Sequence, residues 1–180
     1  MSRRRVVVTG MGLLSPIGNT VESAWQAALG GQSGIGLIDS FDASEFSVKI
    51  AGNVKDFDVA DYMSVKEARR MDRFIQLGIA AAVQAIEDAG LESEAADADR
   101  IGVAIGSGIG CIQTIEDTNQ TLVKSGPSRV SPFFIPGVVI NMISGNVSIR
   151  YGFKGPNIAI VTACTTGTHN IGMGARMIQY

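Results

Sequence analysis

Three short apolar runs, rich in β-branched residues, are separated by longer segments with helical periodicity. The runs are RRVVVT at 4–9, RIGVAIGS at 100–107 and NIAIVTA at 157–163. Short apolar runs of this kind predict strands that are buried on both faces. Because strands that alternate with helices favour a largely parallel sheet, the sequence predicts an α/β fold.

The intervening segments carry helix signals. Asn19 and Glu22 have cap spacing, Trp25 lies on the apolar stripe that follows and is expected in the core, and a glycine pair ends that helix. Ser64 opens one long helix to about Ala89, apolar nearly all round in its second half, which predicts burial on every side. Further helices are expected at 112–124, 131–151 and 164–180.

Composition narrows the class of protein. Charged residues make up only 18% of the chain, and 22 of its 180 residues are glycine, which suggests a paired assembly or a piece of a larger one. The net charge of −2 gives no overall attraction to nucleic acid or membrane. The basic residues at 3–5 precede an apolar run too short for a signal peptide, and the cysteines have no metal-ligand spacing, so a cytoplasmic protein is expected. The chain stops within the last predicted helix, and we therefore expect residues 1–180 to be a truncated piece of a longer chain.

Two glycine motifs resemble nucleotide-binding turns but fail the pattern. At 6–12 the third glycine would fall at Ser15, and no helix begins there to hold a pyrophosphate. At 106–110 the third glycine would fall at Cys111, so close backbone packing beside a pocket is expected instead.

Cys164 is the candidate nucleophile. It follows a predicted buried strand and opens a helix, which is the arrangement of a nucleophile elbow. A helix N-terminus favours the thiolate, and the backbone N–H of the cysteine can help to hold an oxyanion. The alternative is a buried structural cysteine, which is the interpretation for Cys111. His169, the only histidine, is five positions on, or about 140° away around a helix, so it is expected to be a packed, hydrogen-bonded helix residue.

Four motifs together resemble the type II β-ketoacyl-[acyl carrier protein] synthases, condensing enzymes of fatty-acid synthesis. They are VVVTGMG at 6–12, GSGIG at 106–110, SPFFIP at 131–136 and TACTTGTH at 162–169, in family order across the whole chain. The resemblance implies the N-terminal half of a thiolase-like fold, five αβαβα layers in a homodimer. It also implies an acyltransferase of lipid metabolism without cofactor or metal, whose substrates are acyl and malonyl thioesters of acyl carrier protein.

Residue by residue, the resemblance makes Cys164 the acyl-accepting nucleophile. Ile109 and Phe134 would line the acyl channel. The carrier protein would dock on exposed basic residues, namely Lys66, Arg69, Arg70 and Arg129. The second basic site departs from the family, which often has two adjacent basic residues where this chain has Ser128 and Arg129. For the first site, an ordinary solvated helix face is the alternative.

The family's two catalytic histidines and its lysine belong to the C-terminal half, and His169 matches a different position. We therefore expect the 180-residue chain alone not to catalyse condensation. Rival interpretations are a polyketide ketosynthase or synthase I relative, or a non-catalytic binding or assembly piece. A chain-length factor fits less well, because those subunits lack the cysteine.

Overall fold

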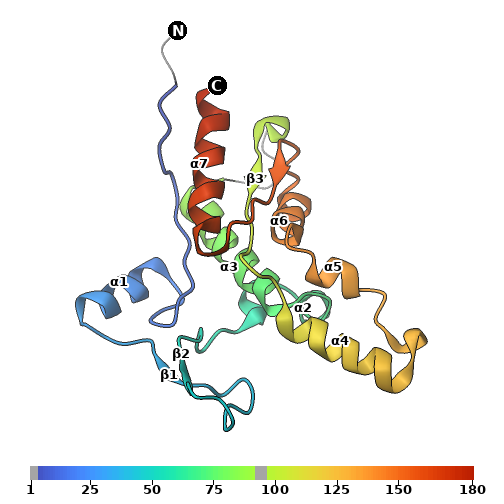
Figure 1. Ribbon diagram of the computed structural model, residues 1–180. Helices are drawn as coiled ribbons and strands as arrows, with labels where there is room; N and C mark the ends of the chain where they lie inside the picture. The colour runs from blue at the N-terminus through green and yellow to red at the C-terminus, as the bar shows by residue number, and fades with distance from the viewer. Residues whose placement is uncertain (1–3, 92–96) are drawn as a thin grey trace.

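The computed structural model describes residues 4–91 and 97–180, and its architecture is α/β (Figure 1). Two small sheets are present among these residues. Strands β1 (Gly36–Leu37) and β2 (Ile50–Ala51) pair antiparallel. Strands β3 (Val103–Ala104) and β4 (Asn157–Ile158) pair parallel, with Val103 opposite Asn157. The second and third predicted strands are therefore confirmed in position, although their paired segments are shorter than expected.

The first predicted strand is wrong, because residues 4–13 run extended without a strand partner. A cavity of about 410 Å³, lined by Arg4, Val103 and Met177, separates the start of this segment from β3 and the last helix. Farther along, the segment lies on helix α3 (Arg73–Asp88), where Met11 N–H donates to Asp88 Oδ2 at 2.8 Å. Backbone groups need a neighbouring strand to form a ladder. Here a side chain of helix α3 accepts a backbone hydrogen bond in place of a strand.

The N-cap of helix α1 (Val21–Leu29) is Thr20, one residue after the predicted cap Asn19. Thr20 accepts from Ser23 N–H, and the Ser23 hydroxyl accepts from Thr20 N–H, which makes a capping box without Asn19 or Glu22. The helix buries its small face, Ala24 and Ala27. Trp25 is 60% exposed, so its predicted place in the core is wrong.

The long helix predicted from Ser64 is two helices. Helix α2 (Val65–Ala68) is capped by Ser64, and α3 starts afresh with Asp72 as its N-cap. Asp72 N–H donates to Gly137 O at 3.1 Å, and Gln76 Nε2 donates to the carbonyls of Ala68 and Met71. The turn at 69–72 is therefore a fixed structure rather than a frayed end.

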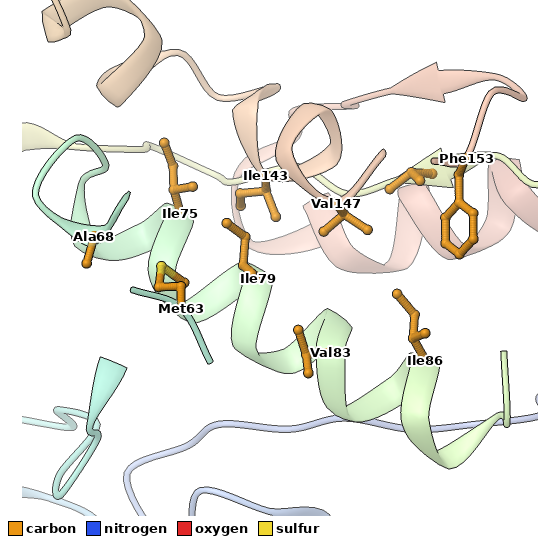
Figure 2. Packing of buried hydrophobic residues seen from close by; sticks show 10 residues of the cluster. Met63, Ala68, Ile75, Ile79, Val83, Ile86, Ile143, Val147 and Phe153 are labelled. Atoms are coloured by element: carbon orange, nitrogen blue, oxygen red, sulfur yellow. The ribbon is translucent and has the colours of Figure 1, made fainter. Parts of the chain in front are cut away.

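The hydrophobic core lies between α3 and α6 (Met142–Tyr151), as Figure 2 shows. Buried residues recur along α3 at helical spacing and face buried residues on α6 and two positions beyond it. The α3 residues are Ile75, Ile79, Val83 and Ile86, and those facing them are Ile143, Val147 and Phe153. Every residue of 74–86 is buried or half-buried, which confirms the expectation for this helix. Sustained burial of branched side chains stabilises the pair, at about 1.5–3 kcal/mol for each fully buried residue.

The remaining elements complete the chain. Helix α4 (Ile112–Ser125) has nearly the predicted bounds, and the stretch predicted at 131–151 forms α5 (Phe134–Val138) and α6. Helix α7 (Thr166–Gln179) is the last element (Figure 1). In the described part of the chain, four short 3₁₀ turns connect these elements: η1 (Val59–Asp61), η2 (Ala98–Arg100), η3 (Pro127–Arg129) and η4 (Ala163–Thr165).

Candidate active site

Cys164 lies exposed in the 3₁₀ turn η4, between β4 and helix α7. The turn is sharp because Ala163 has φ of 52°, in the left-handed region. That conformation costs an alanine about 1–2 kcal/mol, so it persists only where neighbouring contacts impose it. The strand-to-turn-to-helix arrangement predicted for Cys164 is confirmed, and the α-helix begins two residues after it.

Thr162 is held by the residues that follow Cys164. Its N–H donates to Thr166 Oγ1 at 2.9 Å, and its carbonyl accepts from Thr165 Oγ1 at 2.7 Å. Its hydroxyl shares a hydrogen bond of 2.6 Å with His169 Nδ1. The first turn of α7 therefore folds back on Thr162, four residues beyond β4, and closes the elbow around Cys164.

His169 is exposed and bonded to Thr162. The expectation of a hydrogen-bonded helix residue is confirmed, but packing is not, because the ring lies at the surface. The His169 ring bonds Thr162, which precedes Cys164, and this contact offers no support for a catalytic pair of Cys164 and His169.

The glycine loop at 106–110 packs against the elbow, which confirms the predicted close approach of backbones. A Cβ on Gly106 would lie 2.4 Å from Ile160 O, and one on Gly108 would lie 3.0 Å from Ala163 O. Only residues without a side chain allow such distances. The loop carries Ile109, which is 71% exposed, next to the turn that holds Cys164.

Phe134 lies elsewhere, at the start of α5. It lines a cavity of about 150 Å³ together with Arg69, Arg70, Asp72 and Thr114. The Arg70 guanidinium lies 4.3 Å from the ring centroid of Phe133, within cation–π range. The structure therefore groups Phe134 with two of the predicted docking residues.

The other predicted docking residues are also at the surface. Lys66 is exposed on α2, and Arg129 is exposed at the end of η3. Arg69 and Arg70 are exposed on the fixed turn between α2 and α3. All four basic side chains are accessible to an acidic partner.

Cys111 is the buried structural cysteine that the sequence predicts. It is 3% exposed, and its thiol donates to Val138 O at 3.5 Å. Burial, and to a lesser degree the charge of Asp72, raise the pKa of the Cys111 thiol. Within residues 4–91 and 97–180, no group of three or more His, Cys, Asp or Glu side chains could hold a metal ion.

Asn170 is the site residue that the sequence reasoning missed. It is only 3% exposed, and its side chain bonds the backbone of Ile160, ten positions earlier. The signal in the sequence is its spacing of four residues from Thr166, which places the two polar side chains on one face of a helix.

The N-terminal domain model of the β-ketoacyl synthases matches residues 3–180. The chain belongs to the β-ketoacyl synthase family. Two relatives are the 3-oxoacyl-[acyl-carrier-protein] synthases 2 of Vibrio cholerae, 63% identical over 180 residues, and of Coxiella burnetii, 56% identical. In both, the match covers 100% of this chain but 44% of the relative, so this chain spans less than half the length of these relatives.

Solved ketosynthases share the fold. The ishigamide ketosynthase/chain length factor has a TM-score of 0.89 at 27% identity, over 99% of this chain and 45% of that one. A second is a type II polyketide ketosynthase in complex with its acyl-carrier protein and bound to a hexaketide. It has a TM-score of 0.80 at 27% identity, over 98% and 47%. The predicted α/β, thiolase-like fold of the N-terminal half is thereby confirmed.

No helix among the described residues is long and apolar enough to cross a membrane. The cytoplasmic location, and the interpretation of residues 1–180 as a truncated domain, stay predictions.

Proposed function

We propose that this chain is the acyl-accepting part of a fatty-acid condensing enzyme, in which Cys164 is the nucleophile. The observation that carries the proposal is the exposed Cys164 in a strained strand-to-helix turn, within a chain 63% identical to a 3-oxoacyl-[acyl-carrier-protein] synthase 2. A sharp turn of this kind presents a nucleophile above the end of a sheet.

In the first step, the Cys164 thiolate attacks the carbonyl carbon of an acyl chain carried on acyl carrier protein. A new C–S bond forms, the bond to the carrier's sulfur breaks, and the carrier leaves as a thiol after taking a proton. The backbone N–H of Cys164 is a candidate donor to the oxyanion that develops on the carbonyl oxygen.

In the second step, malonyl-carrier protein loses CO₂, and the electron pair of the broken C–C bond attacks the Cys164 thioester. The C–S bond to Cys164 breaks, the thiolate is regenerated and a β-ketoacyl product remains on the carrier. Covalent capture thus divides one difficult condensation into two easier steps. By the family resemblance, the histidines that assist decarboxylation belong to a part of the enzyme outside these 180 residues.

We place the acyl carrier protein on Lys66, Arg69, Arg70 and Arg129. All four are exposed, Arg69 and Arg70 line one cavity, and basic side chains speed encounter with an acidic partner. A related ketosynthase has been solved with its own acyl-carrier protein, which supports a carrier as the partner. Ile109 and Phe134 remain our candidates for the acyl channel, and a homodimer our candidate assembly.

A polyketide ketosynthase is the second candidate. The solved polyketide relative is 27% identical, whereas the synthase 2 relatives reach 63%, and this difference favours fatty-acid synthesis. Saturated acyl-carrier substrates should therefore be used in preference to polyketide intermediates.

A condensation assay on the full-length protein tests the proposal. The assay supplies acyl- and malonyl-carrier protein and measures the β-ketoacyl product. Cys164→Ala should abolish product, while Cys111→Ala should retain it. Product formation by Cys164→Ala would overturn the proposal. Malonyl decarboxylation by residues 1–180 alone would show that decarboxylation does not depend on residues outside this chain.

A further inference from the structure

Asn170 continues the hydrogen bonding of the sheet after its strands stop pairing. The last ladder bond between β3 and β4 runs from Ile105 N–H to Ile158 O at 3.2 Å. Two residues later, Ile160 N–H donates to Asn170 Oδ1 at 3.1 Å, and Asn170 Nδ2 donates to Ile160 O at 2.8 Å. The side-chain amide therefore takes both backbone groups of Ile160, as a neighbouring strand would.

An amide is required for this contact. Asn170 Nδ2 uses its second hydrogen to donate to Thr166 O at 2.8 Å, so both donors and one acceptor site are engaged. Aspartate lacks the donors, and leucine lacks both kinds of group. Because Asn170 is 3% exposed, water cannot easily replace a lost partner.

The neighbouring backbone leaves Asn170 little room to move. A Cβ on Gly106 would lie 3.0 Å from Asn170 Nδ2 and 2.4 Å from Ile160 O. The amide is thus enclosed between the end of β3, the strand leading to Cys164 and the first turn of α7. A contact enclosed on these sides fixes the distance between strand and helix.

We propose that Asn170 is a positioning residue for Cys164. By tying Ile160 to α7, it fixes both ends of the five-residue connection, 161–165, that contains Ala163 and so maintains its left-handed conformation. Thr166 acts with it, since its hydroxyl accepts from Thr162 N–H at 2.9 Å. The inference rests on the proposed role of Cys164, but it predicts effects on the backbone that do not depend on that role.

Amide hydrogen exchange in the full-length protein measures the backbone effect directly. Asn170→Leu should reduce the protection of Ile160 N–H by roughly tenfold, the equivalent of one lost hydrogen bond. Thr166→Val should do the same at Thr162 N–H. Asn146→Leu is the matched control, because Asn146 also donates to the carbonyl four residues earlier, at Met142, but on α6. Unchanged protection of Ile160 in Asn170→Leu would overturn the inference.

The rate of Cys164 alkylation by iodoacetamide provides the second readout. Asn170→Leu should slow the alkylation of Cys164 several-fold, toward the rate of an unstructured peptide thiol. Cys111 should stay unreactive, and Asn146→Leu should leave the rate at Cys164 unchanged. An equal rate in Asn170→Leu and the parent protein would contradict the positioning role. If the parent's Cys164 itself reacts no faster than the peptide thiol, the proposed function is in error, while the exchange result still decides the role of Asn170.

Discussion

The hydroxyl of Thr114, on α4, donates a hydrogen bond to the carboxylate of Asp72, the N-cap of α3. Asp72 also accepts from Phe74 N–H and donates its own N–H to Gly137 O. One residue therefore joins α3, α4 and α5, directly beside Arg69 and Arg70. The proposed docking surface and Phe134 are held together by this junction.

Removing the Thr114 hydroxyl should loosen the junction. Thr114→Val keeps the shape of the side chain but leaves Asp72 Oδ2 without its donor, at a cost of about 1–3 kcal/mol of unfolding free energy. Urea unfolding measures the change. Thr118→Val, one turn farther along α4 in the same cavity, is the control and should change stability by less than about 0.5 kcal/mol. Equal losses in the two variants would contradict the role given to the Asp72 contact.

Gly106 should tolerate no side chain. In Gly106→Ala the new Cβ would lie 2.4 Å from Ile160 O, a backbone atom that cannot move aside freely. We expect a loss of about 1–3 kcal/mol in unfolding free energy, together with slower alkylation of Cys164. Gly174→Ala is the control, because nothing lies within 4 Å of its Cβ, and alanine within a helix should stabilise by about 0.5–1 kcal/mol. A neutral Gly106→Ala would mean that the elbow is not packed as described.

The capping box at Ser64 should make part of the stability pH-dependent. Hydrogen bonds from Ser64 lower the pKa of the Glu67 carboxyl below its usual range. A lowered folded-state pKa gives stability that is present above the unfolded pKa, about 4.3, and is lost as the pH falls through the folded value. Ser64→Ala should therefore cost about 0.5–1 kcal/mol at pH 7 and less at pH 3. Ser64→Thr should behave as the parent protein, and a cost that does not change with pH would contradict the linkage.

The sequence predicts those parts of the fold that local signals determine. The bounds of α4 and the turn from β4 into α7 follow from the pattern of apolar residues along the chain, and both are confirmed. The break at 69–72 escaped prediction because Asp72, which caps α3 by accepting from Phe74 N–H, is also held by Thr114 and Gly137, which lie far along the chain. Apolar character alone also could not say whether residues 4–9 would find a strand partner.

The candidate site, too, has residues that the sequence predicts and residues that only the three-dimensional contacts reveal. Local pattern and the family resemblance both pointed to Cys164, whereas the basic residues followed from the resemblance alone. The structure grouped Phe134 with Arg69 and Arg70. Asn170 was missed because its role depends on a contact with Ile160 that no helical pattern encodes. Buried polar residues act through their partners, and partners become visible only in three dimensions.

Peptide-level mass spectrometry after incubation with an acyl-carrier thioester tests the central claim most directly, because it asks which cysteine receives the acyl group. The chain has two cysteines, and Cys111 is an internal control, since it is buried and its pKa is raised. We predict a thioester on the peptide that contains Cys164, none on that containing Cys111, and none at all in Cys164→Ala. A folded protein that forms no adduct, or carries it on Cys111, would contradict the account.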